Sequence, residues 1–232
     1  MNTVAKSFPV GEAMPSWTPR LYPPKDKMIG EYCRLEPLSL EMHAVELYKS
    51  FRLNQSDSNW VYLPYGPFYE FDAFKIWLDS CARSEDPLFY TVVENSSDEA
   101  VGIASYLRIE PAIGVIEVGH IHFSPRLQRT PMATEAMYLM MKRVFDELGY
   151  RRYEWKCDAL NEPSFKAAAR LGFKFEGIFR QATIYKGRNR DTAWFSIIDK
   201  EWPELKQALE LWLSPENFDE EGRQVKSLVM FR

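Results

Sequence analysis

The sequence is poor in the residues that build disulfide frameworks and metal centres. Of its 232 residues, three are cysteine and three are histidine. Cys33, Cys81 and Cys157 lie far apart, include no C-x-x-C pair and are odd in number, so we expect neither a disulfide framework nor a dedicated zinc site. Free cysteines are typical of proteins in a reducing compartment, which favours a cytoplasmic location.

Long apolar runs and a strong charge excess are also absent. The longest segment without a charged residue has 12 residues (58–69) and contains two prolines and a glycine, whereas a membrane-spanning helix needs about 20 apolar residues. The N-terminus has no apolar core of signal-peptide length. The net charge of −4, from 29 basic and 33 acidic residues, gives no reason to expect a nucleic-acid partner. We therefore predict neither a membrane nor a nucleic acid as partner.

The chain divides into three parts by pattern. Residues 1–29 contain five prolines and no helical or alternating pattern, which predicts an extended arm. Residues 30–199 carry the periodic segments of one folded domain. Residues 200–232 comprise a helix with Trp202 and Trp212 on one side and a polar tail. This helix and the arm are candidates for an interaction surface, including a homodimer.

Within the domain, hydrophobic periodicity and turn residues predict strands and helices in a mixed order. Strands are expected at 32–37, 88–94, 100–109, 115–123, 152–159, 173–185 and 192–198, and helices at 40–51, 73–81, 133–148 and 161–171. Consecutive strands form hairpins and strand-helix-strand units form parallel pairs. The sequence therefore predicts a single α/β (α+β) domain with a mixed sheet.

One segment, 123–136, places a polar loop between a strand and a helix. Thr130 suits the N-cap and Pro131 the first helical position. Because a helix N-terminus exposes unpaired N–H groups and a positive dipole end, the segment is a candidate anion site. An ordinary strand-to-helix turn explains the same residues.

This segment resembles the pyrophosphate loop of the GNAT acetyltransferases, with Gln128-x-x-Pro131-x-Ala133 in place of Q/R-x-x-G-x-G/A. Four further motifs agree with the family and stand in its order, one before this loop and three after it. They are Glu117-Val118-Gly119, Asn161-Glu162-Pro163-Ser164, Leu171-Gly172-Phe173 followed by Glu176-Gly177, and Gly187-Arg188-Asn189-Arg190-Asp191. The last resembles the G-x-x-R-D hairpin of the subgroup that includes the ribosomal-protein N-terminal acetyltransferases. The resemblance implies the GNAT fold, a single domain with a mixed, mostly antiparallel central sheet flanked by helices.

The resemblance also implies acetyl-CoA as co-substrate, with no metal, and a set of residues that bind it. These are Phe123, Gln128, Arg129, Thr130, Pro131, Met132, Ala133, Thr134, Asn161, Ser164 and Lys166. Pro131 departs from the family, which usually has glycine there, so one N–H that would face the pyrophosphate is missing. Lys166 and Arg170 lie four residues apart and suit either the CoA phosphates or a solvated basic edge.

Acetyl transfer to an amine requires a base, and Glu117 is the best candidate. Strict alternation places it on one strand face with Val115, Gly119, Ile121 and Phe123, and His120 and His122 on the other. Apolar surroundings would raise the pKa of Glu117 towards the working range of a base. A structural glutamate with an arginine partner is the alternative. The two histidines are expected to be structural.

Protonation of the leaving thiolate requires an acid, and the resemblance assigns it to Ser164. The alternative role is capping, since Asn161 suits the N-cap and Ser164 stands three residues later. Water or Tyr185 are other candidate donors. The aromatic residues Trp60, Tyr62 and Tyr65 belong to a cluster that suits either an acceptor cleft or core packing under a loop.

The sequence therefore predicts an acetyl-CoA-dependent N-acetyltransferase that acts directly on a primary amine. The acceptor is left open between a peptide N-terminus and a small molecule. The alternative is a non-catalytic acyl-CoA-binding or sensing protein of the same fold. That alternative gains if Glu117 is salt-bridged and no open cleft reaches the thioester.

Overall fold

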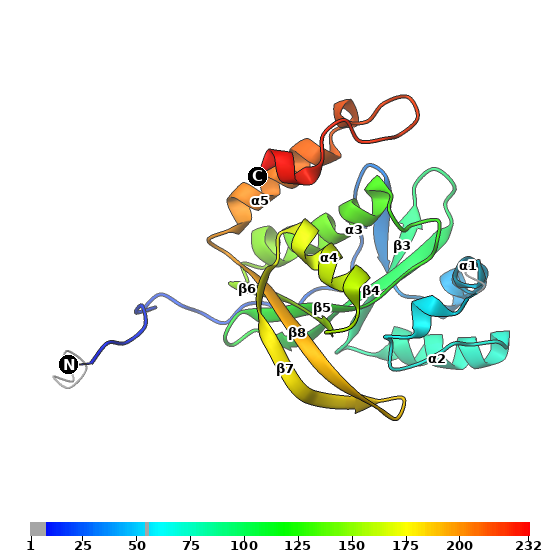
Figure 1. Ribbon diagram of the computed structural model, residues 1–232, viewed down its shortest axis with the longest axis horizontal. Helices are drawn as coiled ribbons and strands as arrows, with labels where there is room; N and C mark the ends of the chain where they lie inside the picture. Colours follow the sequence, from blue (N-terminus) through cyan, green and yellow to red (C-terminus); the bar gives the residue numbers. More distant parts are fainter. Residues whose placement is uncertain (1–7, 54–55) are drawn as a thin grey trace.

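The computed structural model describes residues 8–53 and 56–232, so the first seven residues of the expected arm lie outside the described part. Eight strands form one sheet in the order β1-β2-β3-β4-β5-β6-β8-β7 (Figure 1). Their bounds are β1 Met28–Ile29, β2 Cys33–Pro37, β3 Leu88–Glu94, β4 Ala100–Glu110, β5 Val115–Phe123, β6 Arg152–Asp158, β7 Lys174–Tyr185 and β8 Arg188–Ile198. Only the β5–β6 pair is parallel among the neighbouring strands described. The predicted mixed, mostly antiparallel sheet is confirmed.

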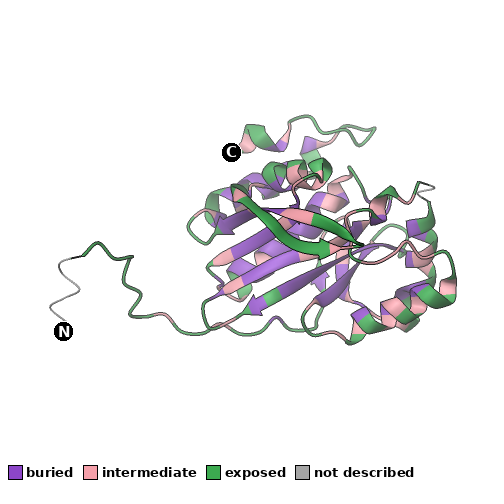
Figure 2. Cartoon of the chain, turned by 60° about the horizontal axis from the view of Figure 1, so that its bottom comes forward, coloured by how far each residue is buried: buried purple, intermediate pink, exposed green. Residues whose placement is uncertain are grey.

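Helices cover both faces of the sheet. Their bounds are α1 Leu40–Arg52, α2 Phe71–Arg83, α3 Pro131–Lys142, α4 Glu162–Leu171 and α5 Trp202–Leu213, with a short 3-10 turn, η2, at Ser58–Trp60. One core cluster joins the sheet to α3, α4 and α5, and the other joins it to α1 and α2. Alternation in β3 separates them, because Tyr90 and Val92 face the first cluster while Phe89 faces the second. Figure 2 shows the buried strands between these layers.

Local signals set the helix ends. The Ser39 side chain caps α1 by accepting from the Met42 N–H, and Gly172 ends α4 with a left-handed φ of 102°. The helix expected at 133–148 is interrupted, because its last turn, Arg143–Glu147, is a π-helix. Gly149 follows with a φ of 67°.

The N-terminal segment is partly attached to the domain. The sheet begins at Met28, before the predicted start of regular structure. Upstream, the Arg20 N–H bonds to the Pro111 carbonyl at 2.9 Å, and the Trp17 indole N–H bonds to the Ala112 carbonyl at 2.9 Å. The first described residues project away from the body of the molecule (Figure 1). The described part of the arm is therefore extended, and its second half lies on the domain surface.

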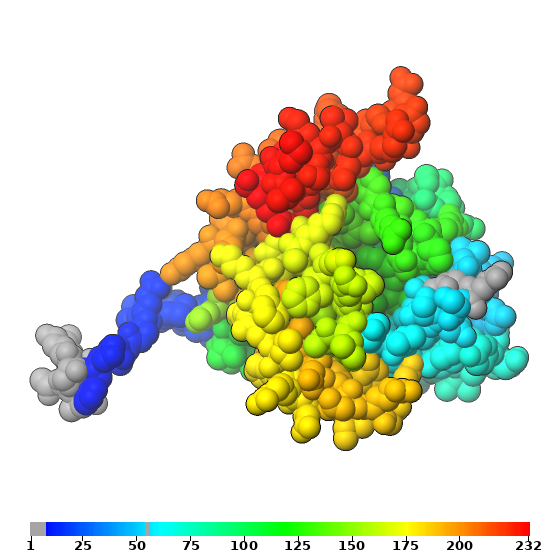
Figure 3. Space-filling view, viewed as in Figure 1, coloured from blue at the N-terminus to red at the C-terminus, as the bar shows by residue number. Residues whose placement is uncertain are grey.

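The tryptophans of the C-terminal helix are not an exposed surface. Trp202 and Trp212 are 4% and 3% exposed. The ring of Trp202 stacks on Phe145 at 5.2 Å, and its N–H bonds to Asp146 at 2.6 Å. These two side chains are therefore packed inside the chain, and a homodimer stays a prediction. Figure 3 shows the C-terminal segment in red, lying against the rest of the molecule.

None of the helices in the described ranges has the length and apolar character needed to cross a bilayer.

Candidate active site

Strand β5 carries a bulge that changes which side chains share a face. Against β4, Gly119 pairs with Ser105 and His122 pairs with Ile103, so three steps along β5 match two along β4. The extra residue is His120, whose φ is 50°. Before the bulge, even-numbered side chains such as Val118 enter the core with α3, and after it odd-numbered ones such as Ile121 do so.

The predicted alternation of β5 is therefore wrong beyond Gly119. His122 stacks on Phe51 of α1 at 3.9 Å, and His120 lies 5.2 Å from the ring of Phe89. Both rings thus lie on the α1–α2 side of the sheet, which is also the side of Glu117. The carboxylate and the two imidazoles share one face because of the bulge.

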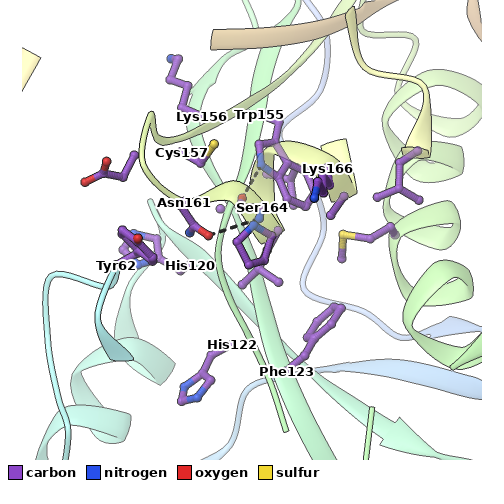
Figure 4. Close-up of a pocket in the computed structure, with 18 of the residues that line it drawn as sticks. Tyr62, His120, His122, Phe123, Trp155, Lys156, Cys157, Asn161, Ser164 and Lys166 are labelled. Atoms are coloured by element: carbon purple, nitrogen blue, oxygen red, sulfur yellow. Dashed lines mark hydrogen bonds between the residues drawn. The ribbon is translucent and has the colours of Figure 1, made fainter. Parts of the chain in front are cut away.

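A cleft opens where β5 and β6 separate. The strands pair from Val115↔Arg152 to Val118↔Trp155, and the following residues of both strands line a cleft of about 2060 Å³. Its helix side includes Thr130, Pro131, Ala133, Thr134 and residues 161–164, at the N-termini of α3 and α4. Its strand side consists of Glu117, Lys156, Asp158, Arg190 and Trp194, from β5, β6 and β8. Figure 4 shows part of this cleft.

The α3 terminus on the helix side is held by local hydrogen bonds. The Thr130 hydroxyl accepts from the Ala133 N–H at 3.3 Å and donates to the Leu127 carbonyl at 2.7 Å. Gln128 donates its side-chain N–H to the Phe123 carbonyl at 2.7 Å. These contacts fix the turn, and the first N–H groups of a helix have no partner within it. The predicted N-cap and Pro131 at the helix start are confirmed.

Most of the predicted cofactor-binding residues lie together in this cleft. Those that line it are Phe123, Gln128, Arg129, Thr130, Pro131, Ala133, Thr134, Asn161, Ser164 and Lys166. Met132 is 7% exposed and belongs to the core, so only its backbone can serve a ligand here. Lys166 pairs with Glu162 at 2.5 Å, while Arg170 donates to the Thr134 hydroxyl at 3.0 Å.

Ser164 does not cap α4 with its side chain. The cap runs from the Ser164 backbone N–H to the Asn161 side-chain oxygen at 3.2 Å (Figure 4). The Ser164 hydroxyl instead accepts from the Trp155 indole N–H at 3.0 Å. A hydroxyl that accepts one bond can still donate its own proton. Ser164 thus has a proton that it can donate. Burial raises the pKa of the neighbouring Cys157 thiol, and the Ser164 hydroxyl opposes this rise only in part.

Glu117 is buried, with 3% of its surface exposed, and one of its two oxygens is occupied. Oε2 accepts from Arg108 Nη1 at 2.7 Å and from Lys156 Nζ at 2.8 Å. Oε1 lies on the side of Gly119, 3.7 Å from where a β-carbon on that glycine would stand. Burial raises the pKa of the Glu117 carboxyl, and the charges of Lys156 and Arg108 oppose the rise only in part.

The two histidines differ in their surroundings. The Tyr65 hydroxyl lies 3.0 Å from His120 Nδ1, and burial, with smaller effects of Arg108 and Arg190, lowers the pKa of His120 to about 4. Burial lowers the pKa of His122 to about 3. Both are therefore neutral near pH 7. Within residues 8–53 and 56–232, no three His, Cys, Asp or Glu side chains gather to hold a metal ion.

The predicted aromatic residues lie at different depths. Tyr62 lines the cleft and its hydroxyl donates to the Leu160 carbonyl at 3.0 Å. Trp60 is 5% exposed and packs edge-on against His122 at 3.9 Å. Tyr65 packs on Trp77 at 4.7 Å. Trp60 and Tyr65 thus lie behind the cleft wall and support it.

Sequence reasoning assigned no role to most of the strand side. Lys156 lies over the Trp194 ring at 3.7 Å, and Asp158 accepts from the Tyr185 hydroxyl at 2.9 Å. Charged residues at Glu154, Lys156 and Asp158 alternate along a strand in the interior of the sheet. That alternation indicates that one face of the strand is polar and lines a cleft.

Comparison with known proteins identifies relatives of the same fold. The chain is 49% identical to a GCN5-related N-acetyltransferase from Brucella melitensis, whose crystal structure superposes with a TM-score of 0.93 over 94% of this chain and 99% of that one. It is also similar to two uncharacterized N-acetyltransferases. It is 28% identical over 149 residues to YnaD of Bacillus subtilis, covering 63% of this chain and 85% of YnaD. It is 27% identical over 113 residues to p20 of Bacillus licheniformis, covering 49% of this chain and only 63% of p20.

The likeness to the ribosomal-protein enzymes is confined to the fold. A putative ribosomal-protein-serine acetyltransferase from Vibrio cholerae is 20% identical, with a TM-score of 0.65 over 74% of this chain and 97% of that one.

The family model for the acetyltransferase (GNAT) domain matches residues 33–174, more than half of the chain. This segment contains the bulged strand, the loop before α3 and the start of α4. The chain belongs to the GNAT acetyltransferase family.

Proposed function

We propose that the protein transfers an acetyl group from acetyl-CoA to a primary amine. The observation that carries this proposal is the cleft between β5 and β6, which places the unpaired oxygen of Glu117 on one side and the hydroxyl of Ser164 on the other. A direct transfer needs one group that takes a proton and one that gives a proton. The cleft offers both without an enzyme nucleophile.

The helix side suits acetyl-CoA as co-substrate. The α3 terminus presents backbone donors at the positive end of a helix dipole, which favours the pyrophosphate. The edges of β5 and β6 beyond Val118 and Trp155 leave room and unpaired backbone groups for the pantetheine chain. Residues 128–134, together with Asn161 and Ser164, would hold the cofactor there. The thioester would then lie near Ser164.

The chemistry assigns different tasks to Glu117 and Ser164. The amine nitrogen forms a bond to the thioester carbonyl carbon, the carbon–sulfur bond breaks, and sulfur leaves with the electron pair. Glu117 Oε1 takes the proton that the amine loses, directly or through water. The Ser164 hydroxyl gives a proton to the thiolate and regains one from solvent. Tyr185 is the weaker donor, because its proton is held by Asp158 and its pKa is raised to about 12 by burial and that bond.

The acceptor is a peptide N-terminus or a small-molecule amine. The hairpin motif 187–191 is the feature that favours a peptide, and the closed aromatic layer under Tyr62 favours a compact ligand. The residues described in the cleft fit a small-molecule amine as well as a peptide N-terminus. Both acceptor classes therefore belong in the first screen.

A non-catalytic acyl-CoA-binding role is the second candidate. The two ion pairs of Glu117 favour it, because they are the arrangement of a structural carboxylate. The open cleft favours catalysis, because it reaches Glu117 and Ser164 together. The two functions differ in turnover but share cofactor binding.

A screen of amines with acetyl-CoA, in which release of the free thiol is measured, distinguishes these functions. We expect acceptor-dependent thiol release with at least one primary amine and an N-acetylated product of the matching mass. CoA binding without acceptor-dependent release across peptides and small amines would support the binding role. Failure to bind CoA would contradict both.

A further inference from the structure

Arg190 is a cation without a counter-ion on the strand side of the cleft. It lies in β8 opposite Thr183 of β7 and lines the cleft. Within the described ranges its guanidinium has no ion-pair or hydrogen-bond partner, and its Nε atom is buried. The guanidinium lies over the Tyr185 ring at 5.7 Å. A buried polar group that nothing in the chain satisfies needs an explanation.

The position of Arg190 is central to the cleft. Burial lowers the pKa of His120 of β5 and raises the pKa values of Cys157 of β6 and Tyr185 of β7. The charge of Arg190 acts on all three groups as a smaller influence. Asp158, a carboxylate of the cleft wall, already accepts from the Tyr185 hydroxyl and the Leu160 N–H. Arg190 therefore lies where the strands converge, and the local carboxylate is engaged elsewhere.

Two more donors without partners line the same cleft. The Trp194 indole N–H is four residues further along β8, and the Asn59 side-chain amide lies in the η2 turn. Both atoms are buried and, in the described ranges, neither finds an acceptor. Lys156 lies over the Trp194 ring at 3.7 Å, but its charge is already paired with Glu117 and Glu154. The unsatisfied donors thus share the cleft with the unpaired guanidinium of Arg190, which suits an anionic ligand group.

This cluster is separate from the expected phosphate site. Ala193 and Phe195 of β8 enter the core with α3 and α4, so the alternate residues Arg190 and Trp194 face the other side of the sheet. The α3 terminus, with its free N–H groups, lies on the first side. An acetyl-CoA held at α3 would present its thioester to the gap and leave Arg190 to the acceptor.

We propose that Arg190 binds an anionic group of the acceptor, so that the substrates are small amines that also carry a carboxylate or a phosphate. A guanidinium binds either anion through two parallel N–H groups, which fixes orientation as well as charge. Trp194 and Asn59 supply further donors to the same oxygens. This inference rests on the proposed acetyl transfer and narrows it, because amide-capped peptides and uncharged amines lack the required group.

Matched pairs of acceptors test the inference. The pairs are the amino acids against their carboxamides, and 2-aminoethyl phosphate against ethanolamine, each assayed by thiol release. We expect a kcat/KM at least about tenfold higher for one anionic class, and the two pair types distinguish carboxylate from phosphate. Arg190→Gln should remove this preference, and Arg190→Lys should retain part of it. Arg188→Gln, an exposed arginine on the same strand, should keep it.

Two outcomes would overturn the inference without affecting the proposed function. One is equal use of both members of every pair by the wild type. The other is an Arg190→Gln variant that keeps the wild-type preference while its CoA affinity is unchanged. If no amine is acetylated, acetyl transfer itself fails, and binding of N-acetyl amino acids against their amides to the CoA-loaded protein still tests Arg190. Equal binding of acid and amide would then overturn it.

Discussion

On the helix side of the cleft, the polar contacts join residues three apart in the sequence, such as Thr130 with Ala133 and Asn161 with Ser164. On the strand side, they join residues that are distant in the sequence, such as Glu117 with Lys156, and donors on Arg190 and Trp194 stay without partners. The turns of the helix side are therefore fixed by local bonds before any ligand binds. The strand side contains charges and donors that a ligand would satisfy.

This difference suggests a division of labour. A side whose turns are fixed by its own caps loses little entropy when it binds, which suits a cofactor used in every cycle. A side with unsatisfied donors discriminates strongly between ligands, because a ligand without the matching acceptor leaves those donors buried and unpaired. Specificity is thus expected to depend on the strand side, and cofactor affinity on the helix side.

The largest expected effect is that of Glu117→Gln. The amide keeps the size of the carboxylate but cannot take a proton, and a positioned base contributes about 10² to 10⁴ in rate. We expect turnover to fall by that order while CoA affinity stays nearly unchanged. Glu154→Gln is the matched control, since Glu154 also pairs with Lys156, at 2.7 Å, yet is not the proposed base. Similar losses in both variants would assign Glu117 to the ion-pair network alone.

The pH profile refines the same prediction. Burial raises the pKa of Glu117, and a base works only in its ionised form. Activity of the wild type should therefore fall as pH decreases through a pKa above that of an ordinary glutamate. The deficit of Glu117→Gln should shrink at high pH, because more of the acceptor amine is already neutral. Equal rates of the wild type and the Glu117→Gln variant from pH 6 to 9 would show that Glu117 is not the base.

A smaller loss is expected for Ser164→Ala. The backbone cap to Asn161 survives, but the Trp155 indole N–H loses its acceptor, which costs about 1–3 kcal/mol when the donor is buried. If Ser164 also protonates the thiolate, turnover per folded molecule should fall as well. An acetyl donor with a thiol of lower pKa should then restore activity, because a better leaving group needs less protonation.

Trp155→Phe is the control for Ser164. It removes the same hydrogen bond but leaves the hydroxyl in place, so stability should fall while turnover of the folded protein persists. Thermal unfolding and thiol release, measured on both variants, separate the two effects. A Ser164→Ala variant that melts early yet turns over normally would make the hydroxyl purely structural.

The contrast between the helix side and the strand side of the cleft also explains which features could be predicted from the sequence. Caps are local, so Thr130, Pro131 and Asn161 can be recognised from neighbours in the sequence, and the structure places them as expected. The bulge at His120 has no such signal. Residues 115–123 read as a regular alternation, and a histidine with a φ of 50° is chosen by the surrounding sheet and not by its own preference.

Residues such as Arg190 were also beyond local reasoning. The motif 187–191 marked a hairpin, but which side chains enter the cleft depends on β8 pairing with β6 in the register Asp158↔Thr192. That pairing brings together strands separated by a helix and another strand. Single-sequence periodicity gives the strand and its two faces, but not the neighbour that makes one face functional.

The smallest expected effect lies on the helix side, at Pro131. This residue stands at the start of α3, where its fixed φ suits the helix and its missing N–H costs nothing within the helix. Pro131→Gly adds one N–H donor for the pyrophosphate but increases the freedom of the unfolded chain, at a cost of about 1 kcal/mol. The two effects oppose each other in binding, since the new donor comes with a less ordered turn. We therefore expect CoA affinity to change by less than about tenfold.

Pro203→Gly is the control for Pro131→Gly. Pro203 occupies the first turn of α5, outside the cleft, so its replacement should lower stability alone. A larger change in affinity at Pro131 than this would mean that the helix side depends on a specific donor and not on its local caps.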